Sequence, residues 1–270
     1  MTDFAEIRQK QQRAWAAGDF SRFATTILLV SESLCETVDL HAGQRILDVA
    51  CGSGNTALCA ARRWCEVTGL DYVPSLLDRA RERAAFEGLD IRFDEGDAVN
   101  LPYEDGTFDA VLSTFGVMFV PDQERAAAEM VRVCRPGGKI GMANFSPSSL
   151  VGSFFRTAAK YALPPRGVKP SVLWGTEDGV EAIFGGSIDE VKVIPRKVMF
   201  RYRSTQHWFD FFRTYFGPIR TVYESLDERR REAFGGELMD LVASANRSGD
   251  DTLVADVEYS EVVVTTKDGS

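Results

Sequence analysis

The chain has 270 residues, which is enough for one large α/β domain or two small ones with a sizeable buried core. Acidic residues outnumber basic ones by 40 to 31, so the net charge is −9 at pH 7. A surface of this sign repels phosphate backbones and anionic membranes. We therefore expect a small-molecule partner and neither a nucleic acid nor a membrane.

The cysteines and the N-terminal residues bear on the compartment. No basic region followed by an apolar run opens the chain, and no later segment approaches the roughly 20 apolar residues of a membrane span. The five cysteines are odd in number and lack a Cys-x-x-Cys spacing, which is typical of reduced thiols. These features predict a cytoplasmic protein. With only two histidines in the chain, we expect no metal site of the His/Cys zinc type, and the oligomeric state is left open.

Two helices are predicted before the first strand, over residues 3–17 and 20–38, separated by the breaker Gly18-Asp19. The pattern then changes to strands that alternate with helices. The strands are predicted at 45–50, 66–70, 91–93, 108–113 and 139–143, and the helices at 55–63, 74–86 and 123–134. Such alternation indicates βαβ crossovers and a parallel sheet.

From Ser146 onward the pattern is less regular. Helices are predicted near 150–161, 177–184, 205–216 and 227–245, with strands at 190–203 and 252–266. No internal repeat or low-complexity linker divides the chain, so we expect the second half to extend the same sheet.

A glycine-rich turn joins the first strand to the helix after it, in the segment Ile46-Leu47-Asp48-Val49-Ala50-Cys51-Gly52-Ser53-Gly54. Glycines let a ligand approach the backbone and the exposed N–H groups of the helix N-terminus. Taken alone, Gly52-x-Gly54-x-x-Ala57 also fits the dinucleotide fingerprint, which is weak support for any one ligand. However, Asp48 places a carboxylate close to the turn, where it would repel a diphosphate and attract an ammonium group. This favours a nucleotide that carries an amino acid over NAD.

Two more carboxylates follow the next strands. Asp71 lies 23 positions after Asp48, near the spacing at which such folds place a carboxylate on ribose hydroxyls. After the third strand, Asp97 could accept from an exocyclic amine, and the Ala98 N–H could donate to a ring nitrogen. A metal site at Asp94 and Glu95 is not expected, because adjacent residues of a strand point to opposite faces.

The glycine segment resembles motif I of class I S-adenosylmethionine-dependent methyltransferases. The later motifs resemble those of this family and come in its order: Val67-Thr68-Gly69-Leu70-Asp71, Gly96-Asp97-Ala98 with Leu101-Pro102-Tyr103, Phe108-Asp109-Ala110-Val111, and Arg135-Pro136-Gly137-Gly138-Lys139. The match covers roughly residues 44–145 and is closest to the small-molecule subfamily of the ubiquinone/menaquinone-biosynthesis type.

The resemblance implies a Rossmann-like α/β fold with helices on both faces of a seven-stranded, mostly parallel sheet. The last strand would be antiparallel, for which 252–266 is the candidate, and an insertion would follow strand 5. We expect a single methyltransferase domain over residues 1–270. Within it, 1–43 would form N-terminal helices or a lid, 44–145 the cofactor-binding core, 146–250 the insertion with strand 6 and the acceptor-pocket region, and 251–270 the last strand and tail.

The resemblance also implies how S-adenosylmethionine would bind and leave as S-adenosylhomocysteine. Asp48 would face the methionine amino group, usually through water, and Asp71 the ribose hydroxyls. Tyr72 would pack on the adenine, whose edge Asp97 and Ala98 would contact. The remaining expected cofactor contacts are Ala50, Gly52 and Gly54 around the methionine and ribose, and Ser113 to Phe115 around the sulfonium.

The function predicted is methyl transfer to an apolar or aromatic small molecule. The acceptor pocket is expected from the N-terminal helices, the loop 113–120 and the aromatic-rich segment 146–223. His207 is the one candidate for a general base, although aromatic residues at the density found beside it usually belong to a core. No other catalytic residue is indicated. Two alternatives stay open, namely a NAD-dependent oxidoreductase and a non-catalytic protein that binds the cofactor.

Overall fold

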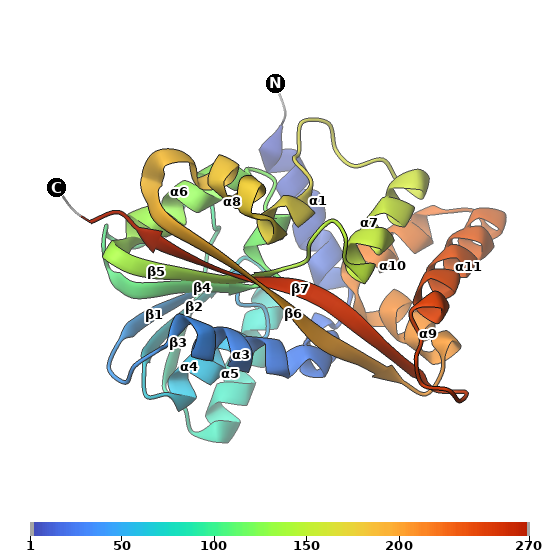
Figure 1. Cartoon of the computed structure of the whole chain (residues 1–270), viewed down its shortest axis with the longest axis horizontal. Coiled ribbons are helices and arrows are strands. Elements are labelled where there is room, and N and C mark those ends of the chain that lie inside the picture. The colour runs from blue at the N-terminus through green and yellow to red at the C-terminus, as the bar shows by residue number, and fades with distance from the viewer. Residues whose placement is uncertain (1–2, 269–270) are drawn as a thin grey trace.

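One seven-stranded sheet organises the chain in the computed structural model, which describes residues 3–268 (Figure 1). The strand order is β3-β2-β1-β4-β5-β7-β6. The first five strands are parallel, and β7 runs antiparallel to both of its neighbours. The predicted seven-stranded sheet with an antiparallel last strand is thus confirmed. The strands are β1 (Arg45–Val49), β2 (Glu66–Asp71), β3 (Ile91–Glu95), β4 (Phe108–Thr114), β5 (Cys134–Asn144), β6 (Ile188–Tyr202) and β7 (Leu253–Thr266).

Helices cover both faces of this sheet (Figure 1). One face carries α3 (Leu28–Val38), α4 (Asn55–Arg62) and α5 (Pro74–Glu87), and the other carries α6 (Gln123–Val133) and α8 (Glu177–Phe184). Beside the far half of the β6–β7 pair, α7 (Leu150–Tyr161) contacts β7 and α9 (Thr205–Tyr215) contacts β6. Helices α10 (Gly217–Ser225) and α11 (Glu228–Ser244) pack against α7 and α9. The N-terminal helices are α1 (Phe4–Ala17) and α2 (Phe20–Ala24), and the short 3₁₀ turns are Thr25–Ile27, Val117–Phe119, Ser171–Gly175 and Gly185–Ser187.

The second N-terminal helix differs from the prediction, because it is divided into α2, the turn Thr25–Ile27 and α3. The hydroxyls of Thr25 and Thr26 each donate to the carbonyl three residues earlier, at 2.8 Å. Such local bonds compete with the regular helical ladder. The helix therefore changes direction here, and its first part lies close to the C-terminal ends of the strands.

Two further differences concern the later elements. Strand β5 begins at Cys134 rather than at 139, since Cys134 pairs with Phe108 before a shift in register. Helix α10 was not predicted, and its start carries Pro218 within the first turn, where proline is well tolerated.

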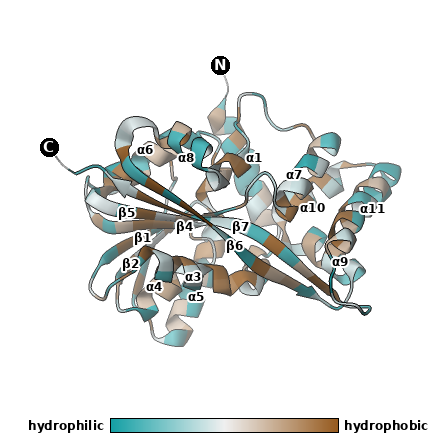
Figure 2. Cartoon of the chain, in the orientation of Figure 1, coloured by the Kyte–Doolittle hydropathy of each residue, from teal (hydrophilic) through white to brown (hydrophobic). Residues whose placement is uncertain are grey.

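The core lies between the sheet and the helices. Figure 2 shows stretches of apolar residues along the strands, whereas the surface helices mix apolar and hydrophilic residues. Strands such as β1 are buried on both faces, as expected for a parallel sheet covered on both sides. The C-terminal ends of β1 to β4 all open toward α1, which places any ligand of such a sheet at that edge.

Candidate active site at the strand ends

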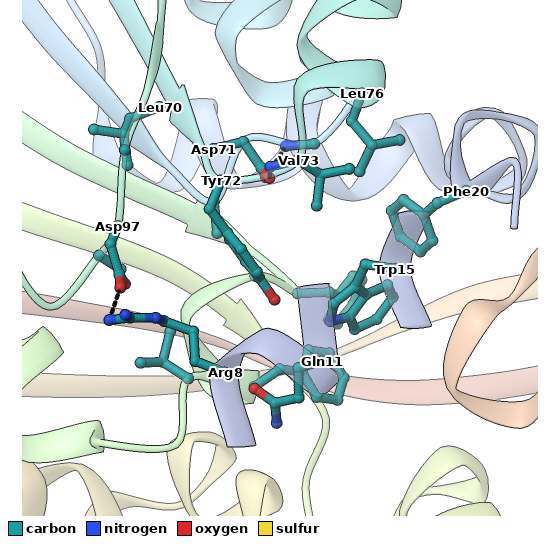
Figure 3. Close-up of a pocket in the computed structure, with 18 of the residues that line it drawn as sticks. Arg8, Gln11, Trp15, Phe20, Leu70, Asp71, Tyr72, Val73, Leu76 and Asp97 are labelled. Atoms are coloured by element: carbon teal, nitrogen blue, oxygen red, sulfur yellow. Dashed lines mark hydrogen bonds and ion pairs between the residues drawn. The ribbon is translucent and has the colours of Figure 1, made fainter. Parts of the chain in front are cut away.

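A cavity lies at the C-terminal ends of β1, β2, β3 and β4, under α1 (Figure 3). The empty space within it and at its mouth amounts to about 670 Å³. Its lining consists of Arg8, Gln11, Trp15, Phe20, Ala50, Gly52, Leu70, Asp71, Tyr72, Val73, Leu76, Gly96, Asp97, Ala98, Phe115, Gly116, Phe119, Val120 and Pro121. We call it the main cavity. A side cavity of about 410 Å³ shares Phe20, Ala50, Gly52 and Phe115 with it and extends to Asp48 and Thr56.

The glycine turn brings bare backbone to both cavities. Gly52 has a φ of +55°, and a Cβ added there would meet only the Phe20 ring, at 3.9 Å. Ala50 also has a positive φ, of 53°, which a non-glycine residue rarely adopts outside functional sites. Gly54 serves a different purpose, because a Cβ there would lie 3.1 Å from the Ala80 Cβ on α5. Gly54 therefore lets two elements pack closely and does not line either cavity.

Asp48 is a buried carboxylate with one oxygen unused. Its Oδ2 accepts the N–H of Ala57 at 2.9 Å, whereas Oδ1 has no partner among the described residues, and the residue is only 1% exposed. Burial, with a smaller contribution from the nearby Asp71, raises the pKa of Asp48 to about 8, although the hydrogen bond from Ala57 lowers it. A cation at this oxygen would supply the partner that a buried carboxylate requires.

Asp71, at the end of β2, holds the glycine turn and lines the main cavity. Its Oδ2 accepts the Gly52 N–H at 2.8 Å and its Oδ1 accepts the Val73 N–H at 2.9 Å. Burial raises its pKa to about 6, opposed by these backbone bonds. Each carboxylate oxygen retains a second lone pair, so Asp71 can still accept from ligand hydroxyls.

The third group of predicted residues follows at the neighbouring strand ends. Tyr72, Asp97 and Ala98 all line the main cavity, and Figure 3 shows Tyr72 between Asp97 and Trp15. Asp97 Oδ1 accepts the Val99 N–H at 3.2 Å, and its Oδ2 pairs with Arg8 Nη1 at 2.5 Å. The structure thus brings the predicted adenine-contacting residues together and adds Arg8, which the sequence did not single out.

The turn after β4 contributes Phe115 but not the Ser113 side chain. The Ser113 hydroxyl donates to the Val49 carbonyl at 2.8 Å and accepts the Val117 N–H at 2.9 Å, and the residue is fully buried. It joins the ends of β4 and β1 instead of lining a cavity. Phe115 has a φ of 50° and stacks on Phe145 with ring centroids 4.0 Å apart. This strained turn places Phe115 where the two cavities meet.

The candidate base and the expected acceptor lining lie elsewhere. His207 is exposed on α9, and its Nδ1 accepts the Arg203 N–H at 3.3 Å. No residue of 146–223 lines either cavity. Many aromatic side chains of that segment belong to the core, such as the fully buried Trp208, which packs on Phe212 with centroids 4.8 Å apart. The acceptor lining expected from 146–223 is therefore absent from these two cavities, and its place in the protein stays a prediction.

The N-terminal helices supply aromatic side chains to the lining of the main cavity. Trp15 and Phe20 line the main cavity and meet edge to face, with centroids 5.3 Å apart. Trp15 also contacts Phe119 at 5.2 Å and Phe216 at 5.7 Å. One wall of the main cavity is thus aromatic and the facing wall carries carboxylates.

These features fit a ligand with a cationic amino group, a diol and a purine edge. The unpartnered oxygen of Asp48 suits an ammonium, and Asp71 suits hydroxyls. Gly52 leaves room for a ligand against the backbone. Within residues 3–268, we find no group of three or more His, Cys, Asp or Glu placed to hold a metal ion, and no helix long and apolar enough to cross a membrane.

Known proteins similar in sequence share this core. A family model described as "Methyltransferase domain" matches residues 47–142. The uncharacterized protein Rv1403c of Mycobacterium tuberculosis is 38% identical over 235 residues, which cover 84% of this chain and 86% of that protein. Demethylmenaquinone methyltransferase of Deinococcus radiodurans is 44% identical over 128 residues, or 46% of this chain and 53% of that protein.

Solved structures share the fold. The YcgJ protein from Bacillus subtilis superposes with a TM-score of 0.62 at 19% identity, covering 88% of this chain and 99% of that one. Phosphoethanolamine N-methyltransferase 2 of Haemonchus contortus, in complex with S-adenosyl-L-methionine, gives a TM-score of 0.54 at 19% identity, covering 88% of this chain and 52% of that one. Neither the oxidoreductase nor the non-catalytic alternative finds support among these proteins.

Proposed function

This chain belongs to the class I S-adenosylmethionine-dependent methyltransferases, and we propose that its methyl acceptor is a small molecule with an apolar or aromatic body. The aromatic wall of the main cavity carries this proposal. On that wall the Phe20 and Phe119 rings contact Trp15, and Phe115 also lines the cavity. Such rings favour flat apolar ligands. The Deinococcus radiodurans relative, whose name gives demethylmenaquinone as its acceptor, supports the same class.

We further propose how the cofactor is held. Asp48 accepts the ammonium group through its unpartnered oxygen, and Asp71 accepts the ribose hydroxyls. Tyr72 packs on the adenine, and Asp97 and Ala98 contact its edge. The side cavity takes the methionine part and the main cavity the adenosine part, because Asp48 lines the first and the other four residues line the second.

The chemistry then depends mainly on position. S-adenosylmethionine supplies a methyl carbon already activated by a sulfonium, so the protein must hold the nucleophile in line and exclude water. Phe20 and Phe115 line both cavities where they join, and the Trp15 and Phe119 rings close the apolar side. No histidine or lysine is among the described residues that line either cavity. We therefore assign the four aromatic side chains a role in positioning the acceptor and not a role in proton transfer.

A panel of acceptors tests the proposed class. The purified protein would be incubated with S-adenosylmethionine and quinols, phenols, aliphatic amines, peptides or RNA, and S-adenosylhomocysteine formation would be measured. We expect turnover with an aromatic small molecule. Turnover confined to peptides or RNA contradicts the proposal, and cofactor binding without any turnover favours the non-catalytic alternative.

A matched pair of variants ties the acceptor to the aromatic wall. Phe119→Ala should raise the KM for the acceptor, because it opens the wall beside Trp15, and should change the affinity for S-adenosylhomocysteine little. Phe86→Ala is the control, since that ring is 92% exposed on α5. If Phe119→Ala and Phe86→Ala give the same KM for the acceptor, the acceptor does not bind at the aromatic wall.

A further inference from the structure

Helix α1 lies across the open side of the main cavity without entering the core. Arg8, Gln11 and Trp15 of this helix line the cavity (Figure 3), yet none of its residues is buried. Trp15, in its second half, packs on the Phe20, Phe119 and Phe216 rings, whereas Arg8 and Gln12 hold it through polar contacts. The contacts at its two ends therefore decide how it can move.

Helix α1 is bound to the loops proposed to hold adenine through Arg8 in its first half and Gln12 just past its middle. Arg8 Nη1 pairs with Asp97 Oδ2 at 2.5 Å, and Gln12 Nε2 donates to the carbonyl oxygen of Tyr72. The side chains of Arg8 and Asp97 are 41% and 23% exposed. An ion pair so accessible to water is weakly held and can open without disturbing the core.

The C-terminal end of α1 is joined to α10 by close backbone packing. A Cβ added at Gly217 would collide with the Ala14 carbonyl oxygen, and one at Gly18 would lie 2.7 Å from the Tyr215 carbonyl oxygen. Arg220 Nη1 also donates to the Ala17 carbonyl oxygen at 2.6 Å. This end of the helix is therefore fixed, whereas the first half is held by polar side chains.

We propose that Arg8 is a positioning residue that latches α1 as a strap over the cofactor, and that cofactor exchange requires the Arg8–Asp97 pair to open. The strap swings about its fixed end at Gly18 and Gly217. Arg8, Gln11 and Trp15 line the main cavity with the strap closed, so we assign this closed arrangement to the loaded protein. The proposal rests on the placement of the adenosine part given above.

Binding kinetics of S-adenosylhomocysteine test this latch. Arg8→Ala is compared with Arg13→Ala, which removes the same charge from an exposed position of the same helix. We expect Arg8→Ala to speed dissociation about two- to five-fold, as for the loss of an accessible ion pair, while Arg13→Ala matches the wild type. Arg8→Lys should restore much of the slow dissociation.

Amide hydrogen exchange of the ligand-free variants gives a second readout, independent of ligand. We expect faster exchange over the first half of α1 in Arg8→Ala and no change in Arg13→Ala. Equal dissociation rates and equal exchange in the two variants overturn the latch. Tighter binding by Arg8→Ala also overturns it, because Arg8 would then compete with the cofactor for Asp97. Failure of the wild type to bind S-adenosylhomocysteine would instead overturn the cofactor placement itself.

Discussion

Replacing Asp48 with asparagine should raise the stability of the free protein at pH 8 and weaken its binding of S-adenosylhomocysteine. Asparagine keeps the shape of the side chain, and its oxygen can still accept the Ala57 N–H. It cannot ionise, and it places an NH2 group where the carboxyl has its second oxygen. Stability and binding should therefore change in opposite directions.

The stability change follows from the raised pKa. Burial raises the pKa of Asp48 from 3.8 to about 8, so between these values the carboxyl is protonated in the folded protein and ionised in the unfolded chain. The wild type therefore loses stability as pH rises through this interval. At about 1.4 kcal/mol per pH unit, the loss between pH 4 and pH 8 is at most about 5 kcal/mol. Asp48→Asn does not lose stability in this way. Its free energy of unfolding should therefore increase relative to that of the wild type as pH rises.

The binding change follows from the lost ion pair with the ligand ammonium. Hydrogen bonds to charged groups contribute about 1.5–3 kcal/mol, so the affinity of Asp48→Asn at pH 8 should fall roughly ten- to hundred-fold. The affinity of the wild type should rise between pH 6 and pH 8, as Asp48 ionises more readily. The affinity of Asp48→Asn should stay constant between pH 6 and pH 8.

Urea denaturation at pH 4, 6 and 8 and calorimetric titration with S-adenosylhomocysteine measure both effects. Asp240→Asn is the control, because Asp240 is exposed on α11. The reasoning is refuted if Asp48→Asn binds as tightly as the wild type at pH 8. It is also refuted if the difference in stability does not grow with pH.

Asp71→Ala should weaken the binding of S-adenosylhomocysteine by about 1–3 kcal/mol in the same titration, and an unchanged affinity would count against the ribose contact. Gly116→Ala should lower the free energy of unfolding by about 1–3 kcal/mol, since the added Cβ would lie 2.7 Å from the Ala50 carbonyl oxygen. Gly186→Ala, with nothing within 4 Å, should change it little in a parallel denaturation experiment. His207→Ala should leave the turnover number unchanged, and a large fall would return a catalytic role to this exposed side chain.

The core of the fold could be predicted because its signals are local. These signals are consecutive in the sequence for strand β1, the glycine turn and α4, and each of the three carries its own periodicity or breaker. Their observed bounds differ from the predicted ones by only a residue or so. The antiparallel direction of β7 was also predicted, but from the family resemblance and not from the residues of 252–266.

The remaining features depend on contacts between distant segments. Arg8 lies 89 positions from Asp97, so no local pattern marks their pairing. Aromatic composition could not separate core from cavity, and Trp208 is core whereas Trp15 lines the cavity. The position of Ser113 at the C-terminal end of the fourth strand was predicted, but its hydroxyl points to the neighbouring strand β1, which no local pattern indicates.

A crystal structure of the protein with S-adenosylhomocysteine tests the central claim most directly. We predict the ligand ammonium within hydrogen-bonding distance of Asp48 Oδ1, the ribose hydroxyls at Asp71, and the adenine beside Tyr72 and Asp97. A ligand bound away from these strand ends, or none bound at saturating concentration, would contradict the account.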